Sequence, residues 1–270
     1  MLLRPSPRLA WTLPALLACL VSPVIAQGTA DQARLTIGVG LMHTSGGGTV
    51  WAIPAQPISV DAGASDTLAL ARNLNSSFGF VFSAAYAPGR YLGFAADVLV
   101  TRLGSGDRCR IVRTRGATFT EDLCGSLDNT EYSSSTSILA AGVILRPGFR
   151  GPIQPYARLM GGFGVIQQSL IQTAGFVRSA NGVADAVIYR DDSGTLLSPY
   201  YAVVIGATAA AGTGWQFRWD LRDSFIALPG ITGATARQGL TPRTTMRGHH
   251  LFSFTVGVDI VLERKRGQRY

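Results

Sequence analysis

The residues that could carry out covalent chemistry are few in this chain of 270 residues, which has three histidines. One of them stands in the segment His43-Thr44-Ser45. A serine hydrolase needs a histidine within hydrogen-bond reach of the serine, and a carboxylate that orients the histidine. No carboxylate is close in sequence, so Asp66 or a residue from another segment would have to supply it. Polar residues at the end of a strand are the simpler interpretation, and a hydrolase is the alternative.

The other two histidines form the pair His249-His250. A zinc site takes three or four protein ligands, and the sequence offers no further histidine or cysteine nearby. We interpret the pair as polar residues at the beginning of a strand, and we predict neither a metal site nor a cofactor. The glycines at 46–48 and 161–164 lack the Lys-Ser/Thr ending of a phosphate loop, so they indicate loop freedom and close packing instead.

Cys109 and Cys124 are two of the three cysteines in the chain. A pair at this spacing in an oxidising compartment usually forms a disulfide. We predict that bond, and the loop that it closes corresponds to roughly 3 kcal/mol of stabilisation in the chain-entropy model.

The amino-terminal segment has the layout of a secretory signal. Arg4 and Arg8 precede an apolar run at 10–21, which is too short to span a bilayer as a helix. Small residues then precede an expected cleavage after residue 26, so we predict a signal peptide over 1–26. A lipoprotein box at 16–19 is the alternative, but apolar residues follow it where a polar mature start would be expected.

The composition favours a membrane β-barrel or a secreted β-sandwich. Only 15% of the residues are charged and 32 are glycine, whereas soluble proteins average about 25% charge. The net charge of +8 is concentrated at the ends, in the signal and in a basic tail at 263–270. The rest is nearly balanced, so we predict no nucleic-acid partner. The tail contains Arg264, Lys265, Arg266 and Arg269.

Eight segments alternate bulky apolar residues with small or polar ones at the period of a β-strand. The clearest has Trp215, Phe217, Trp219 and Leu221 on one face and charged residues on the other. The predicted strands cover about residues 34–41, 77–86, 91–102, 134–146, 155–167, 199–211, 215–225 and 250–262.

The connections between these strands are alternately long and short. Short turns are expected at 88–90, 147–154 and 212–214. Long loops are expected at 44–73, 103–133, 168–198 and 226–248. Outer-membrane barrels have short periplasmic turns and longer extracellular loops, whereas a compact soluble domain rarely carries four such loops. The even number of strands places both termini on the periplasmic side.

The bulky face of each strand consists of Phe, Trp, Leu, Val and Ile, and the slender face of Gly, Ala, Ser and Thr. A sandwich would bury the bulky face between two sheets and show a charged face to water. The interior of an eight-stranded barrel is just wide enough for side chains to fill it. We therefore predict that the bulky face contacts lipid and that the slender face lines the interior.

Seven charged residues share the slender face, and their signs nearly balance. Buried unpaired charge is costly, so we expect these side chains to neutralise one another in a network that plugs the barrel. An ion-conducting pathway is the alternative. The predicted network comprises Arg34, Asp97, Arg158, Arg218, Asp220, Arg222 and Asp259.

Aromatic residues at strand ends or in loops are candidates for the belts at the two membrane interfaces. They are Trp51, Tyr86, Tyr91, Phe149, Tyr201, Trp215 and Phe225.

The last strand resembles the assembly signal of the small outer-membrane barrels of the OmpA/OmpX type. Its positions are Thr255, Gly257, Ile260 and Leu262. The segment Pro155-Tyr156, followed by 161–164, resembles the middle strand of that family. The resemblance covers about 33–262 and implies an eight-stranded barrel whose last strand is read by the barrel-assembly machinery. One departure is that eight residues follow Leu262, where the family usually ends on an aromatic residue.

We therefore predict an all-β, closed, antiparallel eight-stranded transmembrane barrel over 27–262, surrounded by outer-membrane lipids. The expected role is structural or interactive, through long extracellular loops that present a surface to an external ligand. The second loop, stapled by Cys109 and Cys124, is the best candidate for a rigid contact surface. The alternatives are a narrow pore for small solutes, a lipid-A-modifying enzyme of the kind that occurs on such barrels, and a secreted β-sandwich that binds a ligand.

Overall fold

The computed structural model describes residues 34–61, 64–114, 118–147, 153–167, 170–179, 182–191, 194–212 and 214–263. The predicted signal peptide at 1–26 lies outside the described residues. So do Phe149 and all of the predicted tail except residue 263.

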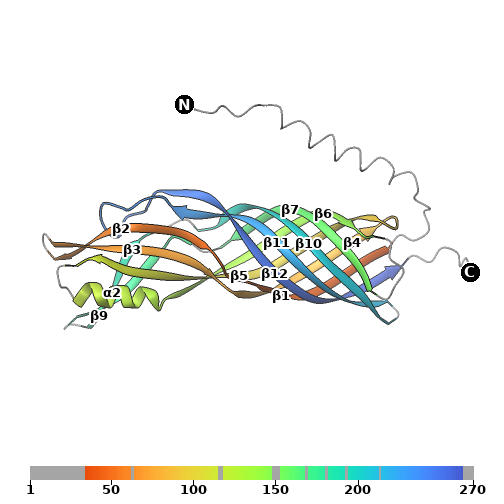
Figure 1. Ribbon diagram of the computed structural model, residues 1–270, viewed down its shortest axis with the longest axis horizontal. Coiled ribbons are helices and arrows are strands. Elements are labelled where there is room, and N and C mark those ends of the chain that lie inside the picture. Colours follow the sequence, from red (N-terminus) through yellow and green to blue (C-terminus); the bar gives the residue numbers. More distant parts are fainter. Residues whose placement is uncertain are drawn as a thin grey trace, which may run out of the picture.

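Eight antiparallel strands form a closed ring (Figure 1). β4 pairs with β5, and the pairing continues from strand to strand around to β12. β1 closes the ring by pairing with β4 on one side and with β12 on the other. The predicted eight-stranded barrel is confirmed. Its strands are β1 (Arg34–Thr44), β4 (Ser77–Ala87), β5 (Leu92–Arg113), β6 (Glu131–Leu145), β7 (Ile153–Ile166), β10 (Leu196–Gly212), β11 (Trp215–Ile231) and β12 (Thr244–Glu263).

Side chains along the barrel strands alternate between the interior and the outer surface. In β4, Phe80 and Phe82 are each 51% exposed, whereas Val81 and Ser83 between them are buried. The same holds in β12, where Phe252 and the alternate residues after it point outward. A water-soluble protein does not expose so many large apolar side chains in one continuous band. The prediction that the bulky face points away from the interior is confirmed.

A tight turn joins β10 to β11 at one end of the barrel. Gly214 has a φ of 82°, which residues other than glycine rarely adopt. Its carbonyl accepts a 2.8 Å hydrogen bond from the Val261 amide of β12, so the turn is also tied to the neighbouring strand. Short connections of this kind gather at the end where β1 begins and β12 ends (Figure 1).

The long connections differ from the prediction, because they are largely ordered in strands and one helix. The first contains β2 (Thr49–Asp61) and β3 (Ala64–Asn75), and the second contains α2 (Thr118–Asp128). The third contains β8 (Thr173–Ser179) and β9 (Gly182–Tyr189). Barrel strands also run further than predicted, since β5 continues to Arg113 and β11 to Ile231.

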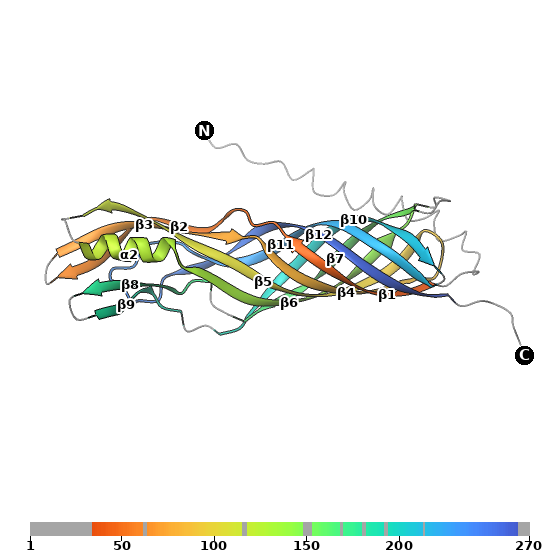
Figure 2. The same cartoon turned by 90° about the horizontal axis from the view of Figure 1, so that it is seen from below.

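These elements form a cap that extends the barrel at the end opposite the short turns (Figure 1). Beyond Gly104, β5 pairs with β3, and β3 pairs with β2, so three strands form one wall of the cap. Figure 2 shows α2 between this wall and the β8–β9 hairpin. Leu68, Leu123 and Ile188, from β3, α2 and β9, are buried together with the barrel interior in one apolar core. The cap is therefore a packed extension of the barrel.

No helix in the described part of the chain is both long and apolar enough to cross a membrane.

Candidate functional site

The first candidate site is the polar interior of the barrel, where charged side chains from three strands meet at Asp97. The Arg158 guanidinium of β7 donates a 3.2 Å hydrogen bond to one oxygen of Asp97, and Arg222 of β11 donates to the other. Arg222 also donates to the Tyr200 hydroxyl at 3.2 Å. The Asp97 side chain is 0% exposed. One carboxylate therefore neutralises two buried arginines.

A second cluster lies around Arg218, nearer to the end with the short turns. Its Nε lies 3.3 Å from Asp259 and 3.9 Å from Asp220. The Tyr156 hydroxyl donates to Asp220 at 3.0 Å, and the Gln216 amide donates to Asp259 at 2.9 Å. These contacts join side chains of β7, β11 and β12 across the interior.

Arg34 completes this cluster at the mouth of the barrel. Its guanidinium donates a 2.7 Å hydrogen bond to the Gln216 side chain. The Arg158 guanidinium lies 4.7 Å from the centre of the Tyr156 ring, so Tyr156 stands between the two clusters. The structure thus places all seven predicted charged residues on the inward face and links each of them to another polar group.

Sequence reasoning missed three uncharged members of this network, namely Tyr156, Tyr200 and Gln216. Each lies an even number of positions from an inward-facing charged or small residue on the same strand, so its side chain points into the barrel as well. The strand alternation that placed Arg158 and Arg218 inside the barrel was therefore sufficient to place Tyr156 and Gln216 there as well.

Close packing inside the barrel depends on small residues opposite large ones. A Cβ atom built at Gly206 would lie 2.7 Å from the Tyr156 ring and 2.6 Å from the backbone oxygen of Trp219. No side chain fits there without moving a strand. Glycine at this position gives Tyr156 room to reach Asp220.

The second candidate site is the cap, which is organised around the buried Arg72 of β3. Its guanidinium makes two hydrogen bonds to the Asp107 carboxylate, at 2.6 and 2.7 Å. It also donates to the Leu170 carbonyl at 2.7 Å. The Trp51 and Tyr132 rings flank it, with centres 5.3 and 4.4 Å from the guanidinium carbon. The Arg72 side chain thus ties β3 to β5 and to the segment around Leu170.

Burial raises the pKa of the Asp107 carboxyl, and the hydrogen bonds and charge of Arg72 offset part of that rise. Burial also raises the pKa of Tyr132, whose hydroxyl donates a 2.9 Å hydrogen bond to the Ala174 carbonyl. Tyr132 therefore stays protonated and holds β6 against β8.

The predicted disulfide between Cys109 and Cys124 is confirmed. It joins the extension of β5 to α2, with the two Cα atoms 5.2 Å apart. The Asp128 carboxylate at the end of α2 accepts a 2.6 Å hydrogen bond from the Cys109 amide. The helix is therefore fixed to the wall of the cap at two neighbouring points.

Replacing both cysteines with serine should loosen α2 without unfolding the barrel. The loop that the disulfide closes corresponds to roughly 3 kcal/mol in the chain-entropy model. We expect amide exchange in 109–130 to become faster, while exchange in the barrel strands stays slow. Hydrogen exchange read by mass spectrometry on the folded protein checks this, and equal protection of 109–130 in both proteins would contradict it.

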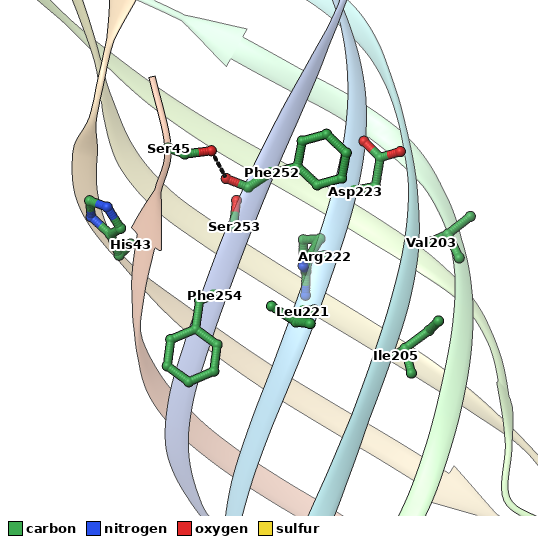
Figure 3. Close-up of a pocket in the computed structure, with 10 residues that line it drawn as sticks. All are labelled: His43, Ser45, Val203, Ile205, Leu221, Arg222, Asp223, Phe252, Ser253 and Phe254. Carbon is green, nitrogen blue, oxygen red and sulfur yellow. Dashed lines mark hydrogen bonds between the residues drawn. The ribbon is translucent and has the colours of Figure 1, made fainter. Parts of the chain in front are cut away.

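The hydrolase candidate borders an apolar hollow of 460 Å³ on the outer surface of the barrel, over β10–β12. The His43 ring packs on Phe78 with ring centres 4.7 Å apart, and the Ser45 hydroxyl donates to the Phe252 carbonyl at 3.1 Å. In Figure 3, β12 and its Phe252 separate both residues from Asp223. These contacts do not form a hydrogen-bonded Ser-His-Asp triad.

Asp66, the other carboxylate considered for this triad, is buried in the cap. It accepts hydrogen bonds from the Thr114 and Thr120 hydroxyls, at 3.1 and 2.5 Å. The threonines place it beside the first turn of α2, so its role is to hold the helix.

His250 lies at the outer surface, with its Nδ1 3.2 Å from the Asp223 carboxylate. Its ring meets Phe225 edge to face at 5.5 Å. Among the described residues, no group of three or more His, Cys, Asp or Glu side chains could hold a metal ion.

Two further sets of predicted residues can be placed. In β12, Thr255 and Gly257 face the interior, whereas Ile260 and Leu262 are 42% and 51% exposed on the outer face.

Trp51 is not part of an interfacial belt, because it is 1% exposed inside the cap and donates to the Leu170 carbonyl at 3.2 Å. The belt prediction was wrong there because β2 is part of the cap, where Trp51 faces the apolar core.

A closed ring of eight tilted antiparallel strands, with an apolar outer band and a charged interior, defines a small transmembrane β-barrel of the outer-membrane class. No family model matches the chain, and no curated protein matches its sequence.

Three solved barrels are similar in structure. Neisserial surface protein A is 12% identical, with a TM-score of 0.39 over 85% of this chain and 96% of its own. Ail, the attachment invasion locus protein of Yersinia pestis, is 10% identical, with a TM-score of 0.37 over 85% and 99%. The outer membrane protein AlkL is 11% identical, with a TM-score of 0.41 over 88% and 94%. These similarities concern the overall fold alone.

Proposed function

We propose that this protein is a non-enzymatic outer-membrane barrel that holds a rigid cap outside the cell and acts through the surface of that cap. The observation that carries the proposal is the buried Arg72–Asp107 pair, around which the cap is built. Flexible loops would need no such centre. An ordered surface loses less conformational entropy when a partner binds, so a packed cap is suited to recognition.

The interior of the barrel supports an anchoring role. Charged side chains fill the interior of the barrel, where Asp97, Arg218 and Arg222 are each at most 1% exposed. Paired charges of this kind bind strands on opposite sides of the barrel to one another. The barrel then serves as a filled, stable base for the cap.

The proposed orientation places the cap outside the cell and the short turns, with both termini, in the periplasm. Outer-membrane barrels have this arrangement of long and short connections. The outward apolar band would contact outer-membrane lipids. Thr255, Gly257, Ile260 and Leu262 would be read by the barrel-assembly machinery before β12 closes against β1.

Cysteine labelling of intact cells tests the orientation and exposure of the cap. Ala236→Cys places a thiol on an exposed segment of the cap, and Gly89→Cys places one in the turn between β4 and β5, at the other end. A membrane-impermeant maleimide should label residue 236 in intact cells and residue 89 only after permeabilisation. The reverse pattern would overturn the proposal.

Because side chains fill the interior of the barrel, we expect it to conduct no ions. Folded protein in a planar bilayer should produce no discrete conductance steps, because charged pairs and tyrosines occupy the lumen. The narrow pore is the competing function, and steps that scale with salt concentration would establish it. A variant that replaces Tyr156 and Tyr200 with alanine provides the positive control, since it removes two large side chains from the lumen.

A further inference from the structure

A polar groove crosses the outer surface where β5 passes from the barrel into the cap. Two hollows of 490 and 570 Å³ adjoin there, and both are lined by Asn73, Asn75, Arg108 and Glu131. The first continues to Asp128 and Thr130, and the second to the glycines at 46–48. Hollows of this size are large enough to hold a small ligand.

Gly106 of β5 lines the first hollow, between β3 and β6, the strands that flank β5. Gly104 pairs with Asn75 of β3 on one side and with Ser133 of β6 on the other. Gly106 pairs with Glu131 of β6. Because Gly106 carries no side chain, the Asn75 amide lies over the β5 backbone there, 3.4 Å from where a Cβ atom would stand, and presents its polar atoms to the groove.

The groove offers donors and acceptors that the protein does not use. Within the described ranges, the side chains of Asn75, Arg108 and Glu131 make no hydrogen bond or ion pair. Their neighbour Asp128 is engaged with the Cys109 amide, and Asn73 accepts from Thr49 at 2.9 Å. The disulfide and these bonds fix the groove, while three polar groups remain directed at solvent.

The chemistry of the groove indicates the class of ligand. Arg108 faces the carboxylates of Glu131 and Asp128, so the groove has both signs of charge and only a small negative excess, which suits a ligand without a strong net charge. The Asn75 amide and the Glu131 carboxylate match hydroxyl groups, which both donate and accept hydrogen bonds. The groove contains little apolar surface, which argues against an acyl chain or an apolar peptide.

We propose that this groove binds a short neutral carbohydrate chain. This inference rests on the proposed function, because it assigns a ligand to the cap. The groove lies just beyond the apolar band, so a sugar of a surrounding glycolipid and a soluble oligosaccharide could each reach it. Both sources present the same hydroxyl chemistry.

The test measures binding of the detergent-folded, full-length protein to an array of immobilised neutral oligosaccharides. In parallel, nanodiscs carrying the protein are titrated with lipopolysaccharide. Binding to the array assigns a soluble source, and binding in nanodiscs alone assigns a membrane source; either supports the site. No binding in both formats overturns it.

Variants locate the site. Asn75→Ala combined with Glu131→Ala should weaken binding about ten-fold or more, because two hydrogen-bonding groups are lost. Gly106→Val should do the same by crowding the groove, since a Cβ there already lies 3.4 Å from the Asn75 amide. Arg110→Ala, an exposed change outside the groove, should leave binding unchanged. Unchanged binding in the folded groove variants would contradict the proposal.

Failure of this inference is distinguishable from failure of the proposed function. If residue 236 is labelled in intact cells and no carbohydrate binds, the cap is outside the cell but the assigned ligand is wrong. Retention of the disulfide and of resistance to cold detergent shows that each variant is folded.

Discussion

Replacing Asp97 with alanine should lower the free energy of unfolding of the barrel by about 3–5 kcal/mol, because removal of one partner leaves buried charge uncompensated. Asp97 is the shared acceptor of Arg158 and Arg222, which are 5% and 1% exposed. The variant would therefore retain two adjacent buried cations. No other carboxylate is placed by the structure within ion-pair distance of either arginine among the described residues.

Urea unfolding of the protein in lipid vesicles, followed by tryptophan fluorescence, measures this change. Asp223→Ala is a matched control, because Asp223 faces outward and its contact with His250 is well exposed. An exposed pair of this kind contributes at most about 1 kcal/mol. A loss below about 1 kcal/mol for Asp97→Ala would show that the central network does not hold the barrel together.

Replacing Arg72 with alanine should destabilise the cap by about 3–5 kcal/mol while the barrel stays folded. The Asp107 carboxylate, which is 2% exposed, would lose both of its arginine hydrogen bonds. The Leu170 carbonyl would lose a donor, and Trp51 and Tyr132 would lose the cation between them. Limited proteolysis should then cut the cap quickly and leave a barrel fragment that still migrates as folded protein in cold detergent.

Arg110→Ala serves as the control for this variant, since Arg110 stands on the same wall of the cap but points outward. Its proteolysis should match that of the unmodified protein. Equal resistance of the Arg72 variant would mean that the apolar core alone maintains the cap.

The barrel could be predicted from the sequence because the alternation of residue types within each strand shows which side chains face inward. In β11, each side chain from Trp215 to Arg222 indicates its face by its type, and neighbouring strands repeat the pattern. The same parity is enough to assign Asp97 and Arg218 to the inward face. Because an unpaired buried charge is costly, each of these charged side chains must pair with an opposite charge from another strand.

The cap could not be predicted in this way, because its pairing is not local. β5 pairs with β4 up to Thr101 and with β3 from Gly104 onward, and nothing in the periodicity of β5 marks this change of partner. The alternation in β3, where Leu68, Leu70 and Arg72 face the core, includes a charged residue of a type that is usually exposed. Arg72 is buried only because Asp107 and a carbonyl from a distant loop meet it.

We propose that the bulky side of each strand, which is exposed on the outer face, contacts lipid, while the slender side lines a closed interior. Spin labels placed singly at positions 80, 81, 82 and 83 of β4, in protein reconstituted into vesicles, test it directly. Labels at 80 and 82 should be accessible to oxygen in the bilayer and shielded from a water-soluble nickel chelate, whereas labels at 81 and 83 should be shielded from both. Labels at 80 and 82 that are buried from oxygen, or that meet the nickel chelate, would contradict the account.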